Sequence, residues 1–416
     1  MIVIAGLPLS IIVLIAVFVL IAVRQVGKVK LRIWQVMLGG AVAVLLTGEI
    51  SPLDAATAVN IDVMLFLLGM FIVGEALYES GYLSHLSYRL FKRAKSVDHL
   101  ILLILFGFGF LSAFLMNDTL AIIGAPMMIY FARKHQTSPK LLLLALAIAV
   151  TTGSVMSPIG NPQNLLIALN GGMTNPFVTF FRHLAIPTII NLFVAYLLLR
   201  LLFKNEFKSG ALDHQEEPIK SPKLAMLSKI SLILIFILIA LKIAFVFLGV
   251  QIDLRLTYIA LIAAAPIVLF GRERVAVVKN IDWSTLVFFI AMFVLMGAVW
   301  NSQFLQDHMT GLEVLSIPII LVISVGLSQV ISNVPFVALY LPLMTLAGAT
   351  DVNMIALAAG STIAGNLLIL GAASNVIIIQ NAEKRGETLK FLEFAKIGVP
   401  LTIINILVYW ICIVLI

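Results

Sequence analysis

The sequence contains little charge and almost no cysteine. Only 11% of its 416 residues are charged, whereas about a quarter are charged in a typical soluble domain, and 62% are hydrophobic. The single cysteine, Cys412, excludes an intramolecular disulfide and a thiolate-rich metal site. These absences exclude an ordinary soluble domain and indicate that the lipid bilayer is the main solvent of the chain.

Motifs of enzymes are also missing. The sequence has no HExxH, no GxSxG and no phosphate-binding P-loop, and its histidines fall in predicted loops or at helix ends. We therefore expect no enzyme activity, no cofactor and no metal site. The net charge of +7 does not indicate a nucleic-acid partner, because the basic residues cluster in short loops between apolar stretches, as in cytoplasmic loops of membrane proteins.

Long uncharged windows predict transmembrane helices. Residues 2–23 carry no charge, and about 20 such residues cross about 30 Å of hydrocarbon as a helix. This window lacks the basic start and the cleavage site of a signal peptide, so we interpret it as a retained helix. Hydropathy predicts helices at residues 2–23, 33–48, 62–84, 141–170, 184–203, 229–249, 256–271, 283–301, 353–381 and 397–416.

Two apolar stretches, residues 99–133 and 315–349, are too long for one crossing. Polar residues divide each into two arms that are too short to cross, so we predict two re-entrant hairpins. Between Asn280 and Glu383 there is no Lys or Arg, which indicates that the second hairpin enters from outside. The first hairpin is flanked by basic residues at both ends and is predicted to enter from the cytoplasm; these residues are Arg89, Lys92, Arg93, Lys95, Arg133, Lys134 and Lys140.

Three sequence patterns recur in the same order in the two halves. Residues 60–62 (NID) recur at 280–282, Asn117 and Pro126 recur as Asn333 and Pro342, and residues 160–164 recur at 371–375, with offsets of 220, 216 and 211. Five crossings in each half, an odd number, give the halves opposite orientations, as in many secondary transporters.

We therefore predict an all-α polytopic membrane protein with both termini external. It consists of two inverted-topology repeats, each with five transmembrane helices plus one re-entrant hairpin, and with broken helices at mid-membrane. The predicted parts are an N-terminal repeat at residues 1–203 (hairpin 99–133, broken helix 141–170), a cytoplasmic linker at 204–228, and a C-terminal repeat at 229–416 (hairpin 315–349, broken helix 353–381).

Polar residues interrupt the apolar segments at membrane depth, and we predict that the substrate-binding site lies at these interruptions. Irregular backbone is tolerated at that depth only when it is buried in protein or lines a wet cavity. The four interruptions each begin a half-helix, and four helix N-termini facing one volume suit an oxyanion or a hydroxylated solute. The alternative is that the polar residues only satisfy these helix ends. The predicted substrate-binding residues are Asn117, Asp118, Thr119, Asn161, Asn164, Ser332, Asn333, Ser374 and Asn375.

Ionisable residues within the spans are candidates for coupling to H⁺ or Na⁺. A carboxylate at a mid-membrane tip is costly when charged and unpaired, so we expect Asp118 to titrate, to bind a cation or to bond to a polar substrate. A role as a simple helix cap is the alternative. Glu75 is the second candidate, and unwound carbonyls near Gly160 and Gly371 are candidate sodium ligands.

At these residues the chain resembles the ion transporter superfamily, and in particular its branch of arsenite permeases and sodium/proton antiporters, ArsB/NhaD. Divalent anion/sodium symporters share the architecture but carry Ser-Asn-Thr at both tips, whereas the tips here are Asn-Asp-Thr and Ser-Asn-Val. The resemblance covers most of the chain and rests on ESGYL at 79–83, LMNDTLAIIGAPM at 115–127, GNPQNLLIAL at 160–169, ISNVPFVALYLPLM at 331–344 and GAASNVIII at 371–379.

The resemblance implies a secondary active transporter of the prokaryotic cytoplasmic (inner) membrane. The Asn-Asp tip resembles that of arsenite permeases, whose substrate As(OH)₃ is largely uncharged at neutral pH. We therefore expect proton-coupled efflux of arsenite or antimonite by alternating access, with Asp118 as the coupling residue. Sodium/proton antiport and sodium-coupled transport of carboxylates or other small anions are the alternatives. The resemblance is compatible with a homodimer, and the sequence leaves open whether a soluble ATPase subunit docks on the chain.

Overall fold

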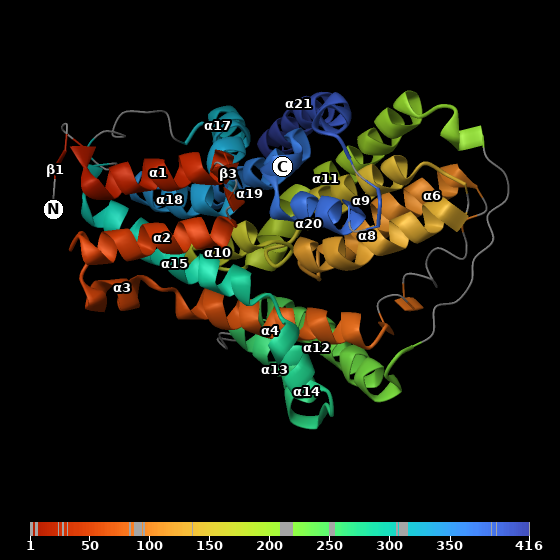
Figure 1. Ribbon diagram of the computed structural model, residues 1–416, viewed down its shortest axis with the longest axis horizontal. Coiled ribbons are helices and arrows are strands. Elements are labelled where there is room, and N and C mark those ends of the chain that lie inside the picture. The colour runs from red at the N-terminus through yellow and green to blue at the C-terminus, as the bar shows by residue number, and fades with distance from the viewer. Residues whose placement is uncertain are drawn as a thin grey trace.

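The protein is almost entirely helical in the part of the chain that the structure describes (Figure 1). This computed structural model describes all residues except 1–2, 5–6, 24, 27–28, 31, 83–84, 87–93, 95, 135, 209–218, 249–253, 305–306, 308–314, 384, 388 and 416. The helices of the first half are α1 (Leu9–Val23), α2 (Ile33–Leu46), α3 (Pro52–Ala58), α4 (Ile61–Glu79), α6 (Val97–Leu103), η1 (Ile104–Phe108), α7 (Gly109–Ser112), α8 (Asn117–Lys134), α9 (Pro139–Ser154), α10 (Pro162–Asn170), α11 (Pro176–Leu202) and η2 (Glu206–Lys208). Those of the second half are α12 (Pro222–Phe247), α13 (Leu256–Phe270), α14 (Arg274–Asn280), α15 (Trp283–Asn301), α17 (Ile317–Ile331), α18 (Asn333–Leu346), α19 (Asp351–Leu367), η3 (Ile369–Gly371), α20 (Ala373–Glu383) and α21 (Phe391–Leu415).

The N-terminal segment differs from the prediction. The first helix begins at Leu9 and not at residue 2, because Val3–Ile4 (β1) pairs antiparallel with Leu7–Pro8 (β2). A second pair of two-residue strands, β3 (Gln25–Val26) and β4 (Val29–Lys30), follows α1. The chain is therefore helical with two small β-pairs, which hydropathy does not reveal.

Proline sets the start of two long helices. α11 begins at Pro176 and α12 at Pro222, both earlier than the apolar windows predict. Proline is favourable in the first turn of a helix because the N–H it lacks has no intrahelical partner there. α12 thus begins inside residues 204–228, the predicted linker, of which residues 209–218 lie outside the described part.

Five described helices are long and apolar enough to cross a membrane: α4, α11, residues Pro222–Phe245 of α12, α15 and α21. α11 exposes large apolar side chains, among them Phe181, Phe193 and Leu197. Apolar surface of this extent fits contact with lipid and not with water. The chain is an all-helical, multi-pass membrane protein.

The first long apolar stretch folds into a helical hairpin. One arm runs from α6 through the π-helical turn η1 to α7, and the other arm is α8. Both outer ends lie at the same end of the molecule, because α6 packs against η2 and the Ser138 amide beyond α8 donates to Glu206 Oε2 of η2 at 3.1 Å. Arg89, Lys92, Arg93 and Lys95, which predict the cytoplasmic entry of this hairpin, lie outside the described residues.

The second long apolar stretch also reverses at its polar residues. α17 and α18 pack against each other on either side of Ser332, whose φ is 71°. A positive φ is uncommon for a residue with a Cβ and is found at turns and functional sites. The backbone therefore adopts a strained conformation at the predicted second tip.

The helices pack in two groups. One group contains α1 to α4 and α12 to α15, in which α4 packs on α13 and α2 packs on α15. The other contains α6 to α11 and α17 to α21, in which α17 packs on α19, α8 on α20 and α11 on α21. Figure 1 shows α4, α12 and α13 on one side of the molecule and α9, α11, α19 and α21 on the other.

Two helices of the second group are buried on all sides. Every residue from Leu141 to Ser154 of α9 and from Asn353 to Asn366 of α19 is buried. α9 and α19 also contact each other. A helix that is apolar and buried all round is surrounded by protein. The C-terminal ends of both helices, where the backbone is broken, therefore lie in the protein interior.

Candidate solute site at the hairpin tips and helix breaks

The tip of the first hairpin contacts the first helix break. The amide of Asn117, the first residue of α8, donates to the Gly160 carbonyl at 3.0 Å. Asn117 is buried, whereas Asp118 and Thr119 are half-buried. Thr119 lies against Gly74 of α4, where an added Cβ would be 2.9 Å from the threonine side chain. The tip thus lies between the first break and Gly74 of α4.

The break between α9 and α10 is held by two asparagine side chains. Asn161 caps α10 by accepting a bond from the Asn164 amide at 2.9 Å. Asn164 Nδ2 donates to the carbonyls of Ser154 (3.1 Å), Val155 (3.3 Å) and Ser157 (3.0 Å). These bonds satisfy carbonyl groups that lie in the break. The side-chain amide of Asn164 therefore stabilises the backbone of the break.

Glycine is required at position 160. A Cβ there would be 2.5 Å from the Ser154 carbonyl oxygen and 3.0 Å from that of Ser112. Its repeat-related counterpart Gly371 is equally close to its neighbours, with the Ala364 oxygen at 2.6 Å and Gln329 Oε1 at 2.8 Å from a Cβ. Both predicted sodium-binding positions are therefore places where backbone and side-chain oxygens converge.

The second break is held in the same manner as the first. Asn375 Nδ2 donates to the Gly365 carbonyl at 2.6 Å, and Gln329 Nε2 of α17 donates to the Ala364 carbonyl at 2.8 Å. Ser374 and Asn375 are completely buried, and Asn333 at the second tip is 6% exposed. The second hairpin and the second break thus meet through Gln329.

Helix α19, which leads into the second break, binds the first break. Asn161 Nδ2 donates to Thr362 Oγ1 of α19 at 3.2 Å, and Thr362 Oγ1 donates to Asn164 Oδ1 at 3.1 Å. Asn366 Nδ2 of α19 donates to Thr152 Oγ1 of α9 at 2.9 Å. The structure therefore brings the predicted Asn161 and Asn164 into one buried polar cluster with Thr362 and Asn366 of α19.

Several buried oxygens at the tips and breaks have no hydrogen-bond partner among the described residues. Buried polar atoms are normally paired, since leaving them unpaired costs free energy. Oxygen atoms of this kind accept bonds from hydroxyl groups or coordinate a cation. They are Asn117 Oδ1, Thr151 Oγ1, Gln329 Oε1, Asn333 Oδ1, Asn366 Oδ1, Ser374 Oγ and Asn375 Oδ1.

Five residues of this cluster are absent from the sequence-based prediction: Thr151, Thr152, Gln329, Thr362 and Asn366. Each lies within an apolar helical segment and not at a tip or a helix start. The available signal is a polar side chain in a segment that is otherwise apolar, because such residues in a membrane are expected to face protein or a cavity.

Of the two candidate coupling acids, Asp118 lies at the first tip, and Glu75 lies on α4 directly after Gly74. In the described part of the chain, neither Asp118 nor Glu75 forms an ion pair with a basic side chain. The described tips and breaks also contain no Lys or Arg. The fixed charge at the solute site is therefore set by carboxylates.

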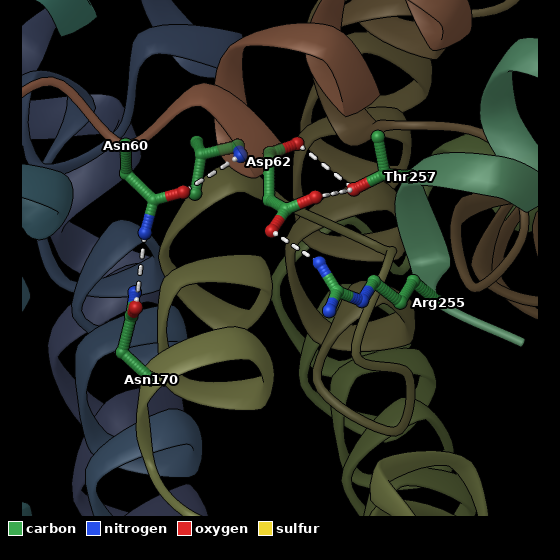
Figure 2. A network of polar contacts seen from close by, with 6 residues as sticks. Asn60, Asp62, Asn170, Arg255 and Thr257 are labelled. Atoms are coloured by element: carbon green, nitrogen blue, oxygen red, sulfur yellow. Dashed lines mark hydrogen bonds and ion pairs between the residues drawn. The ribbon is translucent and has the colours of Figure 1, made fainter. Parts of the chain in front are cut away.

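A polar network joins the N-terminal end of α4 to α10 and α13 (Figure 2). Asn60 accepts a bond from the Val63 amide at 3.1 Å, and its Nδ2 donates to Asn170 Oδ1 at 3.0 Å. Asp62 accepts a bond from Thr257 Oγ1 at 2.9 Å and pairs with Arg255 at 3.5 Å.

A cavity of about 770 Å³ lies beside this network. Asn60 and Asn170 line it, and so do Asp54, Asn301 and Thr345, while most of its other lining is apolar. Its wall continues along α18 as far as Ala338, toward the tip at Asn333. The cavity therefore lies between the two groups of helices.

The fold and this buried polar site are those of a membrane transporter. The sequence matches the CitMHS citrate transporter family over residues 12–353. The chain belongs to this family of the ion transporter superfamily, which consists of transporters and not of enzymes.

Two relatives and one solved structure are similar to this chain over nearly its whole length. An uncharacterized transporter of Mycobacterium tuberculosis is 29% identical over 419 residues, covering 94% of each chain. The silicon efflux transporter LSI3 of Oryza sativa subsp. japonica is 25% identical, covering 88% of this chain and 89% of the relative. The crystal structure of the Alcanivorax borkumensis YdaH transporter superposes with a TM-score of 0.57 at 14% identity, covering 98% of this chain and 97% of the other, a likeness of fold alone.

Proposed function

We propose that the protein is a secondary active transporter that exports arsenite or antimonite in exchange for protons. The observation that carries this proposal is the set of buried, unpartnered oxygens at the tips and breaks. As(OH)₃ offers three hydroxyl donors and no charge, so it matches acceptor oxygens in a site that has carboxylates and no basic side chain. The name of the rice relative, a silicon efflux transporter, agrees with a hydroxylated solute.

Alternating access through an inverted repeat is part of the proposal. Asn164 donates to the Ser154 carbonyl and Asn375 to the Gly365 carbonyl, and both partners are shifted by 211 residues. Asn170 to Leu166 and Asn381 to Ile377 form a second pair of bonds with the same shift. The packing of α4 on α13 and of α2 on α15 is also what a two-fold relation between the halves requires.

A further repeat lies where α11 packs on α21. Residues 188–191 and 402–405 both read TIIN, and all four of their polar side chains are buried. Such a repeat supports equivalent positions for α11 and α21 in the two halves. In the proposed cycle, the group containing both breaks moves against the group containing α4 and α15, which exposes the site to one face at a time.

We assign proton coupling to Asp118, and Glu75 on α4 is the second candidate. A carboxylate that is protonated in one state and ionised in the other changes the charge of the site during the cycle. We place the protein in a prokaryotic cytoplasmic membrane with both termini external. The mechanism requires neither a soluble ATPase nor a second copy of the chain.

Transport by proteoliposomes tests this proposal. With an imposed proton gradient, we expect arsenite to accumulate against its concentration gradient, and we expect a sodium gradient of the same size to have no effect. Passive equilibration without accumulation would show a channel and reject the proposal.

Sodium-coupled transport of a carboxylate is the second candidate. The match to a citrate transporter family favours it, and so do the helix N-termini that point at the site. Accumulation of citrate driven by sodium, with no movement of arsenite, would establish this candidate in place of the first.

A further inference from the structure

A second cavity lies at the C-terminal end of α8. It has a volume of about 560 Å³ and is lined by Pro126, Ile129, Tyr130, Arg133, Lys134 and Arg385. The walls come from α8 and from the turn after α20, so the cavity is separate from the polar cluster at the tips and breaks. Three of the six lining residues are cationic and none is acidic.

The two arginines are held in place by backbone carbonyls. Arg133 Nη2 donates to the Arg385 carbonyl at 2.5 Å, and Arg385 Nη1 donates to the Asn381 carbonyl at 3.0 Å. A guanidinium has five N–H donors, so these bonds leave donors for a ligand. Glu387 lies 3.9 Å from Arg133, which is beyond hydrogen-bond distance. The cavity therefore keeps an excess of positive charge.

The ammonium group of Lys134 is the informative feature. Its Nζ is buried and has no hydrogen-bond partner among the described residues. It lies 6.0 Å from the centroid of the Tyr130 ring. A cation–π contact at that distance offsets only part of the cost of burying an ammonium without a counter-ion. An anion in the cavity would provide the missing partner.

These charges are confined to one end of the protein. At the offset of 216 that relates Asn117 to Asn333, the residues equivalent to Arg133 and Lys134 are Ala349 and Thr350. Ala349 and Thr350 lie beyond the end of α18 at Leu346, so the second half has no cation at the matching positions. The predicted cytoplasmic position of this end accounts for basic residues here, but it does not account for the burial of the Lys134 ammonium, which an anion in the cavity would compensate.

We propose that this cavity binds an oxyanion of the phosphate type, with Lys134 and Arg385 as its ligands and Arg133 positioning the Arg385 backbone. The apolar wall of Pro126, Ile129 and Tyr130 suits a phosphate ester, and basic pockets between transmembrane helices bind anionic lipid headgroups. Free phosphate offers the same chemistry. The two sources are the headgroup of an anionic phospholipid and inorganic phosphate.

Thermal unfolding of the purified full-length protein tests the proposal and separates the two sources. The melting temperature is measured with phosphatidylglycerol, with phosphatidylcholine and with inorganic phosphate. A rise with phosphatidylglycerol alone assigns a lipid headgroup, and a rise with inorganic phosphate as well assigns a free oxyanion. No rise with either anion, or an equal rise with phosphatidylcholine, overturns the proposal.

Substitutions of the lining residues test whether the stabilisation by anion arises at this cavity. Lys134→Met removes the buried ammonium at similar length, so we expect it to raise the melting temperature without anion and to abolish the stabilisation by anion. Arg385→Gln, at an exposed residue, is expected to raise the half-saturating anion concentration roughly tenfold or more, the usual weight of a charge-assisted hydrogen bond. Lys279→Gln, an exposed charge on α14, is the matched control and should change neither quantity.

The result does not depend on the transported solute, because every readout is a binding effect on stability. Anion stabilisation that is unchanged in both Lys134→Met and Arg385→Gln would place the site elsewhere and contradict the proposal.

Discussion

Asn60 and Asn170 connect the two groups of helices through one hydrogen bond, in which Asn60 Nδ2 donates to Asn170 Oδ1 at 3.0 Å (Figure 2). In the proposed repeat, the equivalent residues are Asn280 and Asn381, which do not bond to each other: Asn280 donates to Glu79 Oε1 at 3.3 Å and Asn381 to the Ile377 carbonyl at 3.0 Å. One member of the two equivalent contacts is thus formed and the other is not. Alternating access predicts that they exchange.

Cysteine pairs at these positions test the exchange. Replacing Cys412 by Ser removes the only native thiol, after which Asn60→Cys with Asn170→Cys, or Asn280→Cys with Asn381→Cys, can be cross-linked with a short thiol reagent. We expect the first pair to cross-link in the absence of solute, and cross-linking to stop transport until the link is cleaved. The second pair should cross-link only under turnover. Full transport by a completely cross-linked first pair would contradict a moving contact.

Asp118→Asn should uncouple transport from the proton gradient. The amide has nearly the shape of the carboxylate but cannot gain or lose a proton near neutral pH, so arsenite should equilibrate without accumulating. Solute accumulation in proteoliposomes at a fixed pH gradient is the measurement. Asp351→Asn, the same change at an exposed residue in the first turn of α19, is the control. Coupled transport at the wild-type level in Asp118→Asn would reject the role of Asp118.

Asn164 and Asn333 differ in their hydrogen bonding, so substitution by alanine should have different effects at the two positions. Asn164 holds three carbonyl groups, and Asn164→Ala should lower the stability by roughly 1–3 kcal/mol because buried acceptors lose their donor. Asn333 Oδ1 has no partner among the described residues, so Asn333→Ala should change stability little and weaken solute affinity about tenfold. Thermal unfolding and transport KM separate the two effects. Equal stability losses would show that both asparagines are structural.

Gly160→Ala should destabilise the first break. The new Cβ would be 2.5 Å from the Ser154 carbonyl oxygen, a backbone atom that does not move away cheaply, and overpacking of this kind costs roughly 1–3 kcal/mol. Gly326→Ala is the matched control, because nothing lies within 4 Å of its added Cβ in the middle of α17. That variant should gain about 1 kcal/mol of stability from helix propensity. A stable Gly160→Ala protein would indicate that the break relaxes freely.

Sequence reasoning located the interruptions because lipid leaves few places for a polar residue. The family prediction is confirmed, and Asn117, Asn164, Asn333 and Asn375 are all buried, as expected of residues at protein-enclosed breaks. The helices also agree with the apolar windows, apart from some of their ends. For example, α11 begins at Pro176, earlier than the predicted start at residue 184.

The partners of these residues could not be predicted in the same way. Thr362 lies within α19 with no break beside it, and the packing of α19 on α9 and α10 gives it Asn161 and Asn164 as neighbours. Gln329 likewise reaches the second break because α17 packs on α19. Which face of an apolar helix meets another helix is decided by packing over long sequence separations, and a hydropathy pattern does not contain that information.

The hydrogen bonds between Thr362 and the two asparagines, Asn161 and Asn164, have a consequence for expressing the two halves of the chain separately. The hydroxyl belongs to one half of the chain and the two amides to the other, so each half on its own would leave polar groups bare inside the bilayer. Fragments made by cutting between α11 and α12 should therefore be unstable when produced singly and should reassemble when produced together.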